Sequence, residues 1–199
     1  MSPQAPSNRR RRLLVSATAA LGGAGLLVSA WPFLASMRPS RRTRSAGAPV
    51  VVDISRLEPG QQITVEWRRK PVWVLRRTTE MLARMARPRH LARLRDPDSD
   101  VRSQQPEYAR NPTRSLHPEH LVVIGICTHL GCVPTFRPEV APRDLGPDWD
   151  GGYFCPCHGS RFDLAGRVYR DVPAPTNLVV PPYHYPEEGV VEIGVDPHD

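Results

Sequence analysis

Cysteine is scarce in this sequence of 199 residues, and all four cysteines lie between residues 127 and 157. A small secreted protein stabilised by disulfides distributes its cysteines through the whole chain, so this arrangement excludes that class. His129 and His158 lie among the cysteines. Cysteines and histidines clustered in this way are typical of a metal site.

Acidic residues are absent from residues 1–45, which carry eight arginines. The net charge of +7 therefore belongs to this N-terminal stretch, because the remaining residues sum to −1. Within that remainder, residues 66–114 are basic and residues 115–199 are acidic. No basic stripe interleaved with aromatic residues is present, which argues against nucleic-acid binding. We expect the arginines of residues 66–114 to form a solvated face.

Charged side chains are also absent from residues 13–37, a stretch of 25 residues. About 20 apolar residues span the hydrocarbon core of a membrane, so we expect a single-pass anchor in membrane lipid here. Pro32 is expected where the helix leaves the membrane, because proline disrupts a helix interior. A cleavable signal peptide is the alternative, but its apolar region usually has only about 7–15 residues.

Four arginines lie on each side of this anchor, so charge alone does not predict its orientation. The segment Arg10-Arg11-Arg12-Leu13-Leu14 resembles the twin-arginine export signal, although Arg9 stands where Ser or Thr is usual. A plain anchor with a cytoplasmic N-terminus is the alternative. Both interpretations place residues 1–12 in the cytoplasm and the C-terminal domain in the periplasm, on the outer face of the cell (inner) membrane.

From residue 50 onward the local patterns favour strands over helices. Five runs predict strands, namely Val50–Ile54, Ile63–Trp67, Val72–Leu75, Leu121–Ile126 and Val190–Val195. A short helix capped by Thr78 or Thr79 is expected to end at Pro88, and residues 96–120 to form a loop. The predicted fold class is therefore mainly β, with an antiparallel β domain over residues 50–199 that contains a helix-loop insertion. Residues 38–49, ending in Ser45-Ala46-Gly47-Ala48-Pro49, are expected to form a linker or hinge.

Two segments carry the residues with metal-binding chemistry, Cys127-Thr128-His129-Leu130-Gly131-Cys132 and Cys155-Pro156-Cys157-His158-Gly159-Ser160. If the first cysteine and the histidine of each segment are ligands, each segment supplies one thiolate and one imidazole. Two cysteines and two histidines bind either a zinc ion or a Rieske [2Fe–2S] centre. A zinc finger groups its cysteines together and its histidines together, and zinc would need neither remaining cysteine. A zinc-stabilised module without redox function stays as an alternative.

These segments resemble, at all twelve positions, the paired boxes of the Rieske iron–sulfur subunits of bacterial cytochrome bc1 complexes. With the anchor and the linker, the similarity covers nearly the whole chain. The resemblance implies a three-sheet antiparallel β structure, with one Rieske-type [2Fe–2S] cluster held by a small subdomain over about residues 121–175. It implies that the ligands are Cys127 and Cys155 on one iron and His129 and His158 on the other, with a disulfide between Cys132 and Cys157.

The resemblance also implies roles for residues around the cluster. Ser160 matches a serine that donates a hydrogen bond to a bridging sulfide. Phe162 stands where many members have a tyrosine that donates to a ligand cysteine. Pro173-Ala174-Pro175 resembles a loop that packs against the cluster, and Val172 replaces the glycine that often precedes it. Leu130 and Gly131 of the first box are expected to pack around the site.

In this family the cluster takes one electron from quinol at cytochrome b and passes it to cytochrome c1. The resemblance therefore implies a subunit of a dimeric quinol–cytochrome c reductase that contributes to the proton-motive force. Two imidazoles in place of two thiolates raise the potential to roughly −150 to +300 mV, within reach of a quinol. His129 and His158 are both candidates for contacting the quinol and accepting its proton. The Rieske subunit of a periplasmic arsenite oxidase is an alternative, which the predicted anchor and hinge disfavour.

Overall fold

The computed structural model describes residues 8–38 and 47–196. The chain divides into two units, Met1–Ser45 and Ala46–Asp199, which are described separately. Most of the predicted hinge over residues 38–49 lies outside the described residues. The second unit is called the soluble unit below.

Helix α1 (Asn8–Ser36) is the one element of the N-terminal unit in the described part of the chain. Its 29 residues give a length of about 43 Å at 1.5 Å per residue. The helix is long and apolar enough to cross a membrane, and none of its residues is buried. This agrees with the predicted anchor. Pro32 lies inside the helix, four residues before its end at Ser36, and its lack of an N–H removes one backbone hydrogen bond. Its place at the exit from the membrane stays a prediction.

The soluble unit contains three antiparallel sheets of three strands each among its described residues. Their orders are β1-β9-β8, β2-β3-β4 and β5-β6-β7. The strands are β1 (Val50–Asp53), β2 (Gln62–Trp67), β3 (Lys70–Arg76), β4 (His120–Ile124), β5 (Thr135–Arg137), β6 (Gly152–Phe154), β7 (Arg161–Phe162), β8 (Tyr183–Glu187) and β9 (Val190–Ile193). The predicted mainly β class is confirmed. All five predicted strands are present, with ends shifted by at most two residues, whereas β5 to β8 were not predicted.

The β2-β3-β4 sheet is the middle layer, and both of its faces are buried. Successive side chains of a strand point to opposite faces, so β3 and β4 each contribute to two cores, whereas β2 contributes to one. The core shared with the β1-β9-β8 sheet receives Val72, Val74, Val122 and Ile124. The core on the opposite face receives Trp73, Leu75, Leu121 and Val123. Burial on both faces explains why the sequences of β3 and β4 are continuous apolar runs rather than alternating apolar and polar residues.

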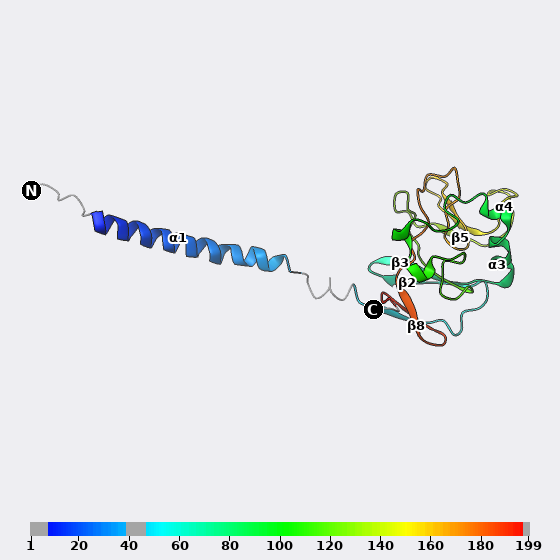
Figure 1. Cartoon of the computed structure of the whole chain (residues 1–199), viewed down its shortest axis with the longest axis horizontal. Helices are drawn as coiled ribbons and strands as arrows, with labels where there is room; N and C mark the ends of the chain where they lie inside the picture. The colour runs from blue at the N-terminus through cyan, green and yellow to red at the C-terminus, as the bar shows by residue number, and fades with distance from the viewer. Residues whose placement is uncertain (1–7, 39–46, 197–199) are drawn as a thin grey trace, which may run out of the picture. The chain divides into compact units, whose positions relative to one another are not determined.

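In Figure 1 the labels β2 and β3 lie between β8, at the lower end of the soluble unit, and β5 in its upper half. The core on the β5 side of the middle layer includes Tyr153 of β6, Phe162 of β7 and two of the four cysteines, Cys127 and Cys155. Both cysteines are therefore fixed in the hydrophobic interior of this half.

The insertion between β3 and β4 contains more structure than predicted. It forms α3 (Thr79–Met85), α4 (Pro88–Leu91), η1 (Arg102–Gln104) and η2 (Glu107–Ala109). The side chain of Thr78 accepts a hydrogen bond from the Met81 N–H, which confirms the predicted cap. Pro88 begins α4 instead of only ending a helix, because proline fits the first turn of a helix. The expected loop over residues 96–120 contains the two 3-10 helices.

The expectation of a solvated basic face is wrong for Arg77 and Arg114, which are buried. Arg77 donates to the carbonyls of Thr113 and Leu164, and Arg114 donates to that of Ala165. Burial lowers the pKa of each guanidinium to about 10, so both stay charged at neutral pH. A guanidinium has five N–H donors, and here they join the insertion to the segment that follows β7.

A buried ionic network also joins α4 to this segment. His90 lies between Asp150 and Asp163, with one ring nitrogen 3.2 Å from a carboxylate oxygen of each. A terminal nitrogen of Arg167 lies 2.7 Å from the same Asp163 oxygen that the His90 ring contacts. Burial alone would raise the pKa of Asp163, but Arg167 and His90 lower it far below its ordinary value. Asp163 therefore remains ionised and holds the insertion and the β7 segment together.

Gly125 follows β4 and leads into the first cysteine segment, where the Trp73 indole covers its backbone. A Cβ at this position would lie 2.2 Å from the indole, which stacks on Tyr153 with ring centroids 4.7 Å apart. We predict that Gly125→Ala lowers the free energy of unfolding by about 1–3 kcal/mol because the indole has to move. Thermal unfolding followed by circular dichroism measures this loss. The double variant Gly125→Ala/Trp73→Phe should lose less free energy of unfolding than the two single variants lose together, because the smaller ring leaves room for the added methyl group. Full additivity of the two losses would contradict the predicted clash.

Candidate metal centre

The first cysteine loop (residues 127–132) connects β4 to β5 and closes on itself through the backbone. The N–H of Cys127 donates to the carbonyl of Cys132 at 2.7 Å, and the N–H of Gly131 donates to the carbonyl of Cys127 at 3.0 Å. Gly131 has φ +84°, a conformation that favours glycine. These bonds hold Cys127 at the base of the loop and leave His129 near its tip.

The second cysteine loop (residues 155–160) connects β6 to β7 and repeats this geometry. The N–H of Cys155 donates to the carbonyl of Ser160 at 2.8 Å, and the N–H of Gly159 donates to the carbonyl of Cys155 at 3.0 Å. Gly159 has φ +75°. The two loops are thus near copies, and each presents a cysteine from its base and a histidine from its outer part.

A disulfide between Cys132 and Cys157 joins the two loops, as predicted. Because it links residues 25 apart in sequence, it reduces the conformational entropy of the unfolded chain and stabilises the folded state by typically about 2–4 kcal/mol. Cys127 and Cys155 remain as free, buried thiols. The Cys155 sulfur lies within 4.8 Å of both disulfide sulfurs, but a disulfide offers no thiolate to a metal.

The two free thiols lie side by side. Burial raises the pKa of the Cys127 thiol, and the neighbouring Cys155 sulfur raises it further. The backbone N–H of His129 and the hydroxyl of Ser160 lie within hydrogen-bond reach of the same sulfur and act in the opposite direction. Two buried thiolates repel each other, so the pair is stable in its ionised form only with a cation between or beside the sulfurs. The chemistry of this pair therefore fits a metal group.

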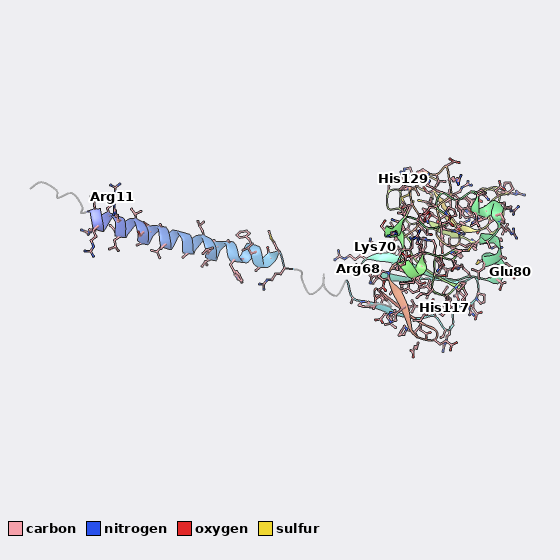
Figure 2. All side chains as sticks on the ribbon, viewed as in Figure 1. Arg11, Arg68, Lys70, Glu80, His117 and His129 are labelled. Atoms are coloured by element: carbon pink, nitrogen blue, oxygen red, sulfur yellow. A yellow bond between two sulfur atoms is a disulfide. The ribbon has the colours of Figure 1, made fainter. Side chains whose placement is uncertain are left out.

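The rings of His129 and His158 also lie together, with centroids 4.8 Å apart and planes at 88°. His158 is exposed and His129 is half-buried. Figure 2 labels His129 at the upper edge of the soluble unit, away from His117 in its lower half. The four predicted ligands thus form two pairs, with the sulfurs inside and the imidazoles outside.

This arrangement fits a two-iron cluster better than a single zinc ion. Among the described residues, the one set of three or more Cys, His, Asp or Glu ligand atoms within 4.8 Å of one another contains neither histidine. The four predicted ligand atoms therefore do not converge on a single point. Separate sulfur and nitrogen pairs are what a cluster with two unlike irons requires.

The proline loop (residues 172–176) is bonded to both cysteine loops. The buried hydroxyl of Ser160 accepts a hydrogen bond from the Ala174 N–H at 3.1 Å. The hydroxyl of Thr128 donates to the Thr176 carbonyl at 2.7 Å. The predicted contact of Pro173-Ala174-Pro175 with the site is therefore made through Ala174, while both prolines are exposed. Thr128 was missed by the sequence analysis, although its polar side chain stands inside the first box.

Leu130 and Gly131 lie on the outer part of the first cysteine loop, whose base alone enters the core. Leu130 is 71% exposed, and a Cβ on Gly131 would meet nothing within 4 Å. Their packing around the cluster stays a prediction. Phe162, by contrast, is fully buried beside Tyr153.

Two family models match this chain. One, described as "Ubiquitinol-cytochrome C reductase Fe-S subunit TAT signal", matches residues 1–40 and supports the twin-arginine interpretation. The other, described as "Rieske [2Fe-2S] domain", matches residues 48–184, which include the insertion and both cysteine loops. The fold and the paired loops therefore define a Rieske protein, and the zinc alternative is wrong.

Curated relatives match nearly the whole chain. The "Ubiquinol-cytochrome c reductase iron-sulfur subunit" of Allochromatium vinosum is 57% identical over 98% of this chain and 93% of its own length. The protein of the same name from Bradyrhizobium diazoefficiens is 43% identical over 93% of this chain and 94% of its own length. A solved chain of "Hyperthermophilic respiratory Complex III" is similar with a TM-score of 0.47 and 22% identity over 90% of this chain and 98% of its own. This chain belongs to the family of ubiquinol–cytochrome c reductase iron–sulfur subunits and holds one Rieske-type [2Fe–2S] cluster.

Phe162 offers a test of how the surroundings of the cluster set its potential. We predict that Phe162→Tyr raises the midpoint potential, because a hydroxyl there would donate to a ligand sulfur and stabilise the reduced state. One neutral hydrogen bond is worth about 0.5–1.5 kcal/mol, which corresponds to roughly 20–65 mV. A redox titration followed by EPR measures the shift. No rise, or a fall, would show that the hydroxyl finds no sulfur acceptor in this core.

Proposed function

We propose that this chain is the electron-transfer subunit of a membrane-bound quinol–cytochrome c reductase. It would take one electron from quinol at cytochrome b and pass it to cytochrome c1. The observation that carries the proposal is the pair of imidazoles at the surface above a pair of buried thiols. When bound, the [2Fe–2S] group supplies reversible one-electron chemistry in the potential range of quinols.

The ligands have different tasks in this proposal. Cys127 and Cys155 hold the cluster where water is excluded, since both are only 2% exposed. His129 and His158 each have a second ring nitrogen that can hold or release a proton at the surface. His158 is the better placed of the two to contact quinol because its side chain is the more exposed.

The surface around the imidazoles suits an apolar partner. Leu130 is 71% exposed and Val133 is 54% exposed, and the exposed Pro173 and Pro175 belong to the adjacent proline loop. Exposed apolar side chains gathered at one site mark an interaction surface. We assign this surface to docking against cytochrome b beside the quinol, with cytochrome c1 as the second docking partner in a dimeric complex.

The N-terminal unit supports a position at the membrane for this reaction. We propose that residues 1–12 stay in the cytoplasm, that residues 13–37 anchor the chain in the inner membrane, and that residues 50–199 lie in the periplasm. The similarity of residues 1–40 to a twin-arginine signal model supports this orientation. Residues 38–49 would then serve as the hinge between two docking positions.

Purification from membranes tests the proposed function. The complex should contain haem proteins, reduce cytochrome c with quinol, and give a Rieske EPR signal on reduction. We predict that Leu130→Ser slows quinol oxidation by up to about tenfold, because a lost apolar contact costs about 1.4 kcal/mol or less, and that it leaves the signal unchanged. Val51→Ser is the matched control, because Val51 is similarly exposed but lies on β1. A complex with the EPR signal but without quinol-dependent activity would contradict the proposal.

The hinge is tested separately. Ala46→Pro combined with Ala48→Pro should lower turnover, because proline fixes φ and stiffens the chain. The EPR signal and midpoint potential of the cluster should not change. The control is Ala46→Ser combined with Ala48→Ser, which alters the same positions without stiffening them. Equal turnover in the proline and serine variants would argue against a moving head.

A further inference from the structure

The insertion is paired with the segment that leads into the proline loop. The N–H of Arg95 donates to the carbonyl of Val168, and the N–H of Arg170 donates to that of Arg93, both at 2.9 Å. An isolated antiparallel bridge pairs Leu94 with Tyr169. Leu94 and Tyr169 are buried in the same small core, so this pairing is held by packing as well as by hydrogen bonds. The proline loop begins two residues after the paired segment.

Arg95 extends this connection onto the proline loop itself. One terminal nitrogen of its guanidinium donates to the Ala174 carbonyl at 3.0 Å, and the other donates to the Val172 carbonyl at 3.1 Å. These two carbonyls flank Pro173. A guanidinium presents two N–H groups in one rigid plane and can hold both acceptors at a fixed spacing, which a lysine ammonium cannot do.

The same part of the proline loop contacts the cluster site from its other side. The Ala174 N–H donates to the hydroxyl oxygen of Ser160 at 3.1 Å. Ser160 is fully buried and ends the second cysteine loop, where its carbonyl accepts from the N–H of the ligand Cys155 at 2.8 Å. Because the Ser160 oxygen accepts from Ala174, its own proton is free to point toward sulfur. A continuous set of contacts therefore runs from Arg95 through Ala174 and Ser160 to the site.

We infer that Arg95 is a positioning residue for the cluster, and that it fixes the proline loop so that Ser160 donates its hydroxyl proton toward the cluster sulfurs. The inference rests on the proposed function only in requiring that the site holds the cluster. A hydrogen bond to sulfur stabilises the more negative, reduced state. Loosening the loop therefore lowers the midpoint potential without removing any ligand.

Arg170 provides a matched control within the same interface. Its side chain donates to the Leu94 carbonyl at 2.9 Å, so it joins the same two segments as Arg95. It makes no hydrogen bond to the proline loop among the described contacts. Replacing Arg170 therefore measures the effect of a general loosening of the insertion on the potential. Replacing Arg95 also removes the two hydrogen bonds to the proline loop.

The test uses the complex purified from membranes and a redox titration followed by EPR. Arg95→Ala is expected to shift the redox equilibrium about threefold toward the oxidised state, which is about 28 mV at 59 mV per tenfold change. Arg95→Lys is expected to recover part of this shift by bonding one of the two carbonyls, and Arg170→Ala to leave the potential unchanged. In a Ser160→Ala background, Arg95→Ala should add little, because the hydroxyl through which it acts is absent.

Three results would overturn the inference. The first is an unchanged potential in Arg95→Ala. The second is an equal shift of the potential in Arg170→Ala. The third is a shift in Arg95→Ala that adds fully to that of Ser160→Ala. Failure of the proposed function is a different result, namely a wild-type complex that has the cluster signal but does not oxidise quinol. The potentials of the Arg95 variants can be measured in either case.

Discussion

The structure of this protein depends on keeping two sulfur atoms side by side in a hydrophobic interior. Neighbouring thiolates repel each other, and burial adds to the cost of ionising them. The cysteine loops offset this by closing on their own backbone and by directing an N–H and a hydroxyl at the Cys127 sulfur. A bound cluster would supply the positive charge that stabilises both sulfurs as thiolates.

Support for these loops comes from regions distant in the sequence. The middle sheet places Cys127 at the end of β4, in the core that also receives Cys155 from the β6–β7 connection. The insertion reaches the other side of this half through buried polar groups, including Arg77, Arg114 and His90. Buried charges are tolerated here because each has carbonyl or carboxylate partners. The insertion is therefore part of the cluster-binding half rather than an appended surface feature.

Much of this arrangement could be predicted from residues that act locally. The cap at Thr78 depends on one side chain, and the middle strands show as apolar runs because both faces of their sheet are buried. Strands β5 to β7 have only two or three residues each and depend on tertiary pairing, so no local pattern marked them. The inward direction of Arg77 and Arg114 also could not be predicted, because their acceptors are backbone carbonyls brought near only by folding.

The four ligand types were predictable because the two boxes match a family pattern at every position. The geometry around them was not, since the contacts of Ser160 and Thr128 reach a proline loop that follows much later in the chain. Arg95 gave no signal at all in the sequence. Its fork-like contact with two carbonyls exists only because the insertion lies beside the segment that precedes this loop.

The disulfide has a consequence for the order in which the protein matures. In the proposed orientation the chain would be exported in the folded state, so that the cluster would be inserted in the reducing cytoplasm, where Cys132 and Cys157 would be thiols. In the folded structure the Cys155 sulfur lies within 4.8 Å of both disulfide sulfurs, and as thiols these would be competing ligands. Formation of the disulfide after export would remove both competitors. In this order the bond would join the two loops after the cluster had been inserted.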